Sequence, residues 1–213
     1  MQTGTKILSI VAGMGVVGSV SALASHLLTA TKVSDVLRKQ GHTFLNFDSD
    51  LDTWKTIAKA YSNSQKNRLT GLTITIASDG QATEDDAKKL RKACKDVIYS
   101  SNHKDKSLLL ATEQWCVKPI TIRDLAKAQG EVLDTNIAQD NQQDRWNEKV
   151  ADYIREGATD KISSVDLTAH TPHQPAEDRK KLKQGCNSLE GKHNYDVDFH
   201  DNFTKFQKWC TPN

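Results

Sequence analysis

Two short stretches decide the fold: residues 54–61 read WKTIAKAY, and residues 146–153 read WNEKVADY. In each stretch Trp and Tyr are seven positions apart, with apolar residues between them at helical spacing. This spacing places the apolar side chains on one face of an α-helix. We therefore predict two amphipathic helices, each of which buries one Trp and one Tyr.

The same residue types recur around both stretches, at a nearly constant distance along the chain. The offset is 92 from Trp54 to Trp146, and it is also 92 from Cys94 to Cys186. Because Trp and Cys are rare, their joint recurrence predicts an internal repeat. The two copies would be residues 30–118 and 119–213. The aromatic residues of the predicted repeated core are Trp54, Tyr61, Trp115, Trp146, Tyr153 and Trp209.

The predicted fold class is mainly α with short extended segments, in two tandem copies of one helical module after an N-terminal apolar helix. Each copy would begin with a short helix, at Ser34–Lys39 and at Ile122–Ala128. The alternation in TGLTITI predicts a strand at Thr70–Ile76, with a weaker counterpart at Ile162–Leu167. Thr83 followed by three acidic residues is typical of a capped helix start.

The N-terminus carries a long apolar run, residues 7–28, without Asp, Glu, Lys or Arg. A helix of this length would span a bilayer core of about 30 Å. We favour an uncleaved signal anchor and assign residues 1–29 to it. A cleaved signal peptide is the second interpretation, because Lys6 precedes the run and Ala22-Leu23-Ala24 matches a small-x-small cleavage site. A buried core helix is the third. The first two interpretations both place the remainder of the chain on the outer face of a membrane or beyond it. We predict a cell-membrane location with the ectodomain outside.

The four cysteines fall two to each copy. Equivalent residues should make equivalent contacts, so the repeat predicts disulfides Cys94–Cys116 and Cys186–Cys210. An oxidising location outside the membrane would permit both bonds. The alternative is two buried free thiols in each copy, since reduced Cys packs as a small hydrophobe.

No cluster of residues predicts a catalytic, cofactor or metal site. The net charge is only +2, and no basic run exceeds Arg179-Lys180-Lys181, so we expect no nucleic-acid partner. His170 and His173 are better explained as part of a polar loop than as metal ligands. We therefore expect a protein that is not an enzyme.

The pattern of these residues resembles large paralogous families of uncharacterised proteins in haemotropic mycoplasmas. The resemblance covers nearly the whole chain and is most specific from Trp115-Cys116-Val117-Lys118-Pro119 to Leu133. It implies a surface protein of a cell without a wall, one of many variants, with no assigned activity. Copy two departs from the pattern near Gln129-Gly130 and at Thr211-Pro212.

These features predict a membrane-anchored, surface-exposed protein of adhesion or antigenic variation, with a host surface protein as partner. Ser62–Leu69 and Thr168–Glu177 would be its variable loops. The alternative is an exported hydrolase or scavenging enzyme with an unrecognised site. A third hypothesis is a structural role in the envelope.

Overall fold

The computed structural model describes residues 31–167 and 174–212, and within these ranges it contains eight α-helices and no β-strand. The mainly α prediction is confirmed at this level. The predicted N-terminal apolar helix lies outside the described residues. Within the described ranges, no helix is long and apolar enough to cross a membrane.

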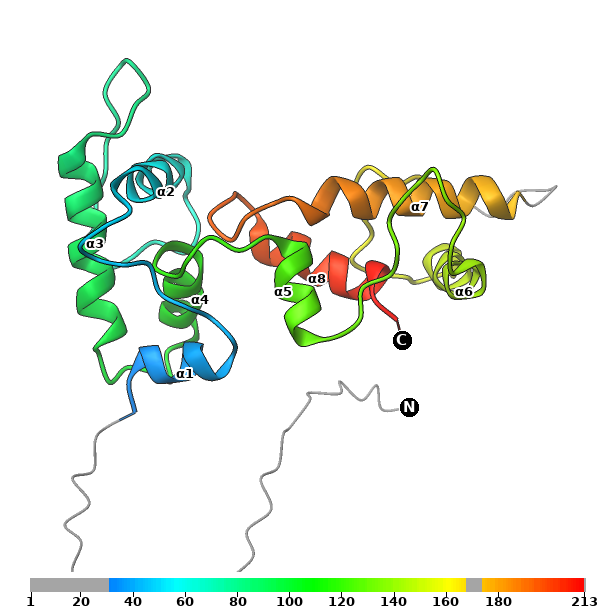
Figure 1. Ribbon diagram of the computed structural model, residues 1–213, viewed down its shortest axis with the longest axis horizontal. Helices are drawn as coiled ribbons and strands as arrows, with labels where there is room; N and C mark the ends of the chain where they lie inside the picture. Colours follow the sequence, from blue (N-terminus) through cyan, green and yellow to red (C-terminus); the bar gives the residue numbers. More distant parts are fainter. Residues whose placement is uncertain (1–30, 168–173, 213) are drawn as a thin grey trace, which may run out of the picture. The chain divides into compact units, whose positions relative to one another are not determined.

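The helices fall into two groups of four along the chain, which we call the first half (residues 31–118) and the second half (residues 119–212). Both halves are visible in Figure 1, and they belong to one contiguous unit. The first half contains α1 (Val33–Lys39), α2 (Leu51–Asn63), α3 (Glu84–Ile98) and α4 (Lys106–Trp115). The second half contains α5 (Ile122–Gln129), α6 (Gln143–Ile154), α7 (Pro175–Glu190) and α8 (Phe199–Cys210).

Helices pack in the same pairs in both halves. In the first half α2 packs on α3, α3 on α4, and α1 on both α3 and α4. In the second half α6 packs on α7, α7 on α8, and α5 on both α7 and α8. Each half also has its own hydrophobic core, built mainly from the apolar stripes of these helices.

Local sequence explains several helix boundaries. Thr83 caps α3 as predicted: its hydroxyl accepts the N–H of Asp86, and the Asp86 carboxylate accepts the N–H of Thr83. After α1 the chain turns at Gly41, whose φ of 93° is a left-handed conformation that glycine adopts without strain. Gly130 ends α5 differently, with an extended φ of 168°.

The strand predictions at Thr70–Ile76 and Ile162–Leu167 are wrong. Burial alternates as expected in the first segment, where Ile74 is buried between the exposed Thr73 and Thr75. However, no neighbouring strand supplies a hydrogen-bonding ladder. The described chain forms only two isolated β-bridges, Phe44–Val117 and Thr121–His193. The alternating pattern therefore reflects a chain that buries one side against helices.

Candidate functional site

Both pairs of cysteines form disulfides, and all four side chains are fully buried. Cys94–Cys116 has a Cα–Cα distance of 5.3 Å, and Cys186–Cys210 has one of 5.8 Å. Each bond joins the third helix of its half to the end of the fourth. The pairing is the predicted one, and the alternative of free thiols is excluded. Chain-entropy estimates assign about 3 kcal/mol of stability to loops of this length.

Next to each disulfide lies a Trp–Tyr pair with edge-to-face geometry. The ring centroids of Tyr61 and Trp115 are 5.1 Å apart, and those of Tyr153 and Trp209 are 4.7 Å apart. Each phenol also donates a hydrogen bond to a buried turn, at 3.2 Å to the Leu72 carbonyl and 3.0 Å to the Ile162 carbonyl. Burial raises the pKa of both the Tyr61 and the Tyr153 phenol.

The Trp indoles of the fourth helices fix a further pair of corresponding turns. Trp115 Nε1 donates to the carbonyl of Asn67 at 2.6 Å, and Trp209 Nε1 donates to that of Asp160 at 2.7 Å. Asn67 and Asp160 both have positive φ, 50° and 55°. Asn and Asp adopt this left-handed conformation more readily than most residues, and the indole has the same role as donor to the turn in both halves.

The α2 and α6 indoles hold the loops that precede their helices. Trp54 Nε1 donates to the carbonyl of Asn46 at 3.0 Å, and Trp146 Nε1 to that of Asp134 at 3.2 Å. All six aromatic residues singled out in the sequence are at most 2% exposed. They act as buried supports of turns and loops, and their rings are not available to a ligand.

The predicted variable loop Ser62–Leu69 is partly buried, and its exposed residues are Asn63, Gln65 and Lys66. Ser64 and Leu69 are buried. Arg68 donates to the carbonyls of Tyr61 and Ser64 at 2.7 and 2.9 Å, and its guanidinium lies 4.0 Å from the centroid of the Tyr61 ring. Of the second predicted loop, Thr168–Glu177, residues 168–173 lie outside the described residues, and with them His170 and His173.

Asn194 joins the two halves, and it is completely buried. Its side-chain amide donates to the carbonyls of Glu113 and Gln114 at the end of α4, at 3.2 and 3.1 Å. Its side-chain oxygen accepts the N–H of Ile120 at 3.0 Å, and its own N–H donates to the Ile120 carbonyl at 3.1 Å. Every polar group of this side chain is therefore satisfied, which makes Asn194 a specific connector.

Charged groups surround this connector. Glu113 lies between two imidazoles, 3.2 Å from His42 Nε2 and 3.9 Å from His200 Nδ1. Lys66 of the first half forms ion pairs with Asp198 and Asp201 of the second, at 2.5 and 3.5 Å. The junction therefore combines one buried amide with partly exposed ion pairs.

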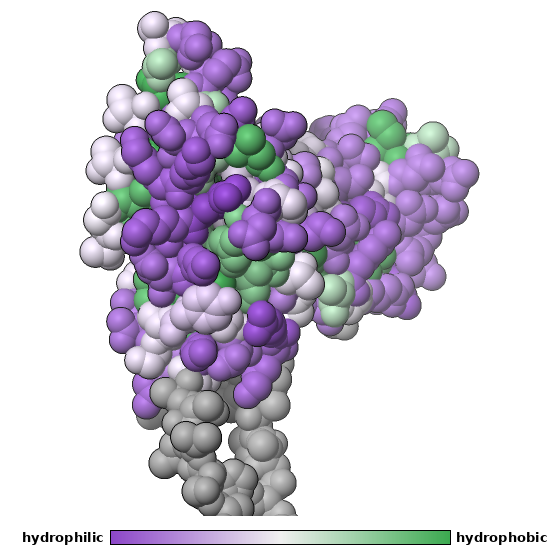
Figure 2. Space-filling model, turned by 60° about the vertical axis from the view of Figure 1, so that its left-hand side comes forward, coloured by the Kyte–Doolittle hydropathy of each residue, from purple (hydrophilic) through white to green (hydrophobic). Residues whose placement is uncertain are grey.

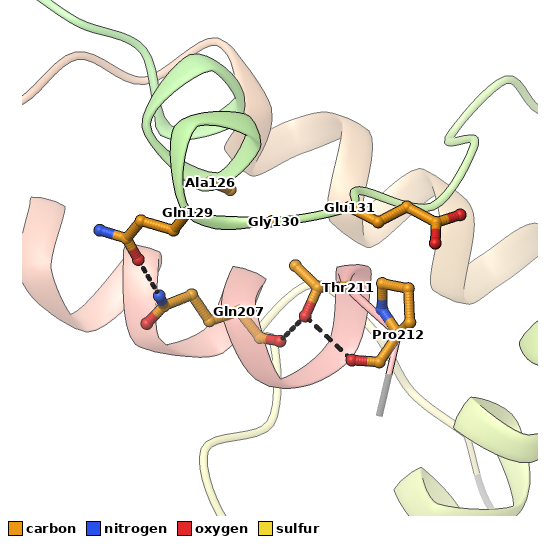
Figure 3. A pocket seen from close by; sticks show the side chains of 7 residues that line it. All are labelled: Ala126, Gln129, Gly130, Glu131, Gln207, Thr211 and Pro212. Carbon is orange, nitrogen blue, oxygen red and sulfur yellow. Dashed lines mark hydrogen bonds between the residues drawn. The ribbon is translucent and has the colours of Figure 1, made fainter. Parts of the chain in front are cut away.

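The surface hollows are small and polar. Figure 3 shows one of about 300 Å³ between the end of α5 and the end of α8. Across it Gln207 donates to Gln129 at 2.7 Å, and the Thr211 hydroxyl donates to the Gln207 carbonyl. Its acidic residue, Glu131, forms an ion pair with Arg145. The polar side chains of this hollow thus bond to one another or, for Glu131, to Arg145 outside it.

A second hollow, of about 340 Å³, lies beside Lys149 and Lys208. Lys149 is only 4% exposed, and burial lowers the pKa of its amine. Enzymes use lysines of lowered pKa as nucleophiles. Here the Lys149 amine donates a hydrogen bond to the carbonyl of Lys208 at 2.9 Å. The bond links α6 to the last turn of α8.

Comparison with known protein families, with curated proteins and with solved structures finds no match to this chain.

Metal-ligating groups do not converge in the described part of the chain. No three His, Cys, Asp or Glu side chains there are placed to hold a metal ion. What the arrangement provides is two rigid frames, each closed by a disulfide and connected through Asn194.

Sequence reasoning missed the polar residues that complete this frame, including Asn194, Lys149 and Lys183. Asn194 follows Asn102 by the repeat offset of 92, which was a usable signal. Lys149 and Lys183 gave no signal, because a lysine on an amphipathic helix is usually solvated. Gly185 was also missed: a Cβ there would lie 2.1 Å from Val165 Cγ2, so only glycine allows that approach.

Proposed function

We propose that this chain is a membrane-anchored surface protein that presents two tandem copies of one disulfide-closed helical module for adhesion or antigenic variation. Its anchor is the apolar segment 7–28. The two buried disulfides support a location outside the reducing interior of the cell. The matched helix pairs support the duplication.

One observation carries the proposed role: the halves share a set of buried aromatic, leucine and cysteine residues, while several exposed positions differ. At the repeat offset the buried Trp54, Tyr61, Leu90 and Cys94 have identical counterparts. Several exposed residues of the same helices differ: Lys59 corresponds to Ala151, Lys92 to Gln184 and Lys95 to Asn187. Other exposed residues recur, such as Lys88 and Lys89, which correspond to Lys180 and Lys181. A shared set of buried residues beneath a surface that changes at several positions fits a protein with a variable face.

The surface composition fits display to solvent and to partners. Figure 2 shows a predominantly hydrophilic face with smaller hydrophobic areas. The large apolar side chains that are exposed are scattered among the described residues and include Leu110 at 39% and Val197 at 53%. A partner would therefore meet mainly charged and polar side chains.

The test replaces only exposed residues of the first half with those at the corresponding positions of the second half. A variant with Lys59→Ala, Lys92→Gln and Lys95→Asn gives the first half the second half's exposed residues. We expect it to keep its unfolding midpoint, because surface changes usually alter stability by less than about 0.5 kcal/mol. Cells displaying the full chain should differ from the variant in binding to host cells or in recognition by antibodies. Equal binding and equal recognition would contradict the proposed role.

Surface location needs its own measurement. Intact cells that express the full chain are treated with a membrane-impermeant amine reagent, which should label Lys92 and Lys95 while leaving the buried Lys183 unlabelled. Labelling only after lysis would overturn the location. An exported hydrolase or scavenging enzyme is the alternative function. Turnover of polymeric or phosphorylated nutrients by the purified chain, abolished by Lys149→Met but not by replacement of the three exposed lysines, would favour it.

A further inference from the structure

The loop between α3 and α4, residues 99–105, has the same place in the first half as the loop with Asn194 has in the second. The N–H of Val33, the first residue of α1, donates to the carbonyl of Ser100 at 3.1 Å. The N–H of Ile122, the first residue of α5, donates to the carbonyl of Lys192 at 2.9 Å. Each loop is thus fixed beside the point where the chain enters its half.

In the second half this loop packs on the first half. Asn194 bonds to the end of α4, and Tyr195 packs against the core of the first half. In the first half Asn102, which corresponds to Asn194, is exposed, and His103, which corresponds to Tyr195, is partly exposed. Tyr99 of the same loop is 56% exposed. The same edge of the module is covered in one half and open in the other.

The open edge is basic. Lys32, Lys104 and Lys106 are all exposed on it. Its two carboxylates are used as helix caps: Asp35 accepts the N–H of Lys32 at 2.9 Å, and Asp105 accepts that of Ser107 at 3.0 Å. The ten-residue helix α4 also begins here, and its N-terminus adds partial positive charge.

The Lys32 ammonium lies 5.4 Å from the centroid of the Tyr99 ring, so an aromatic and a cation share this edge. Tyr and Lys are the side chains that proteins place at the boundary between a membrane and water. Basic residues near an anionic leaflet are attracted to its headgroups. The lysine and tyrosine side chains of this edge are therefore complementary to an anionic lipid surface.

The short segment between Leu28 and Lys32 limits how far this edge can lie from the membrane. Only four peptide units separate Leu28, the end of the apolar segment, from Lys32. Fully extended, they span at most about 14 Å. If residues 7–28 lie in a bilayer, as the proposed function holds, Lys32 cannot be farther than this from the membrane boundary.

We propose that the edge formed by Lys32, Tyr99, Lys104 and Lys106 rests on the anionic headgroups of the anchoring membrane. The contact holds the first half against the lipid surface. It leaves the α2 face and the second half for other partners. The inference rests on the proposed anchoring and adds the orientation of the displayed module.

The test uses the full chain in nanodiscs of neutral phosphatidylcholine, with and without anionic phosphatidylglycerol. Amide hydrogen exchange of residues 99–106 should slow in the anionic discs. Each lysine near the lipid surface corresponds to about a fivefold shift in the contact equilibrium. The variant Lys104→Glu with Lys106→Glu should lose this protection, and Glu at these positions suits the start of α4.

The matched control is Lys180→Glu with Lys181→Glu, the same change of charge at two exposed positions on α7. It should keep the protection of residues 99–106. Equal exchange in the two lipids, or equal loss in both variants, would overturn the lipid contact. Mass mapping of both disulfides verifies that each variant is folded.

Failure of the anchor is distinguishable from failure of the contact. A chain that leaves the discs on gel filtration overturns both the anchoring and the contact. A chain that stays with the discs, but whose loop exchanges equally in the two lipids, overturns only the contact.

Discussion

The two halves have the same arrangement of helices, but their side chains differ in character at three pairs of corresponding positions. The members of each pair are 92 residues apart. The first half has Ile57, Ala87 and Arg91, of which the first two are fully buried. The second half has Lys149, Arg179 and Lys183, all at most 7% exposed. At two of these positions the first half buries apolar groups where the second half buries cations, and at the third the partly exposed Arg91 corresponds to the buried Lys183.

The cations compensate for a longer loop before α6. Nine positions separate Leu45 from Trp54, whereas thirteen separate Leu133 from Trp146. Lys183 donates to the carbonyls of Gln139 and Asn141 at 2.9 and 3.3 Å, and Arg179 forms an ion pair with Asp140. These bonds tie the carbonyls of the longer loop to α7 and fix the added residues against it.

The comparison teaches that one frame tolerates different interiors if every polar group finds a partner. A buried cation is costly unless hydrogen bonds and an opposite charge replace its hydration. The guanidinium of Arg179 also holds the pKa of Asp140 below its ordinary value. The following predictions test whether the halves share their frame and differ only in these compensations.

The largest effect is expected where the halves agree. Trp115→Ala and Trp209→Ala each remove a buried indole, its contact with Tyr and its bond to a turn. Each should lower the free energy of unfolding by about 3–5 kcal/mol, measured by urea denaturation. A small loss for one variant beside a large loss for the other would show that the frames are not equivalent.

The next effect should separate the halves. Lys183→Met removes the buried donor that bonds the carbonyls of Gln139 and Asn141 and should cost about 3 kcal/mol. Arg91→Met, the corresponding change in the first half, should alter stability by less than about 0.5 kcal/mol because Arg91 is partly exposed. Equal losses in the two variants would argue against a specific role for the cations.

A smaller effect is expected at the connector. Asn194→Ala leaves the carbonyls of Glu113 and Gln114 and the N–H of Ile120 without a partner, at a cost of about 2 kcal/mol. Asn102→Ala, at the same place in the first half, is the control and should be nearly neutral. Hydrogen exchange should show faster opening at Ile120 in the first variant alone; if Ile120 stays protected, Asn194 does not hold the junction.

The smallest effect depends on pH. The hydroxyl of Thr83, together with its N–H, lowers the pKa of Asp86 below the ordinary 3.8. Asp86 therefore contributes stability that is present above about pH 3.8 and is lost as the pH falls through its folded-state pKa. Asp86→Asn should flatten the decline of the urea midpoint in acid. In the second half Pro175 stands three residues before Asp178, so no hydroxyl equivalent to that of Thr83 exists there; an unchanged slope in Asp86→Asn would contradict this assignment.

Much of the frame was predictable because it follows local rules. The Trp–Tyr spacing predicted α2 and α6, and the threonine with following acids predicted the start of α3. The cysteine pairs followed from equivalence of position. The strand prediction failed because alternation in TGLTITI reports which side is buried, and it does not report whether a partner strand exists.

The sequence by itself determined the helices, their buried faces and the pairing of the cysteines, because these depend on spacing along one chain and on rare residues that recur. Tertiary structure alone decided that Asn194 connects the halves, that Lys183 holds a loop, and that Gly185 admits Val165. Each of these depends on which distant backbone carbonyl or methyl group comes within reach, and a residue's type and spacing do not encode that distance.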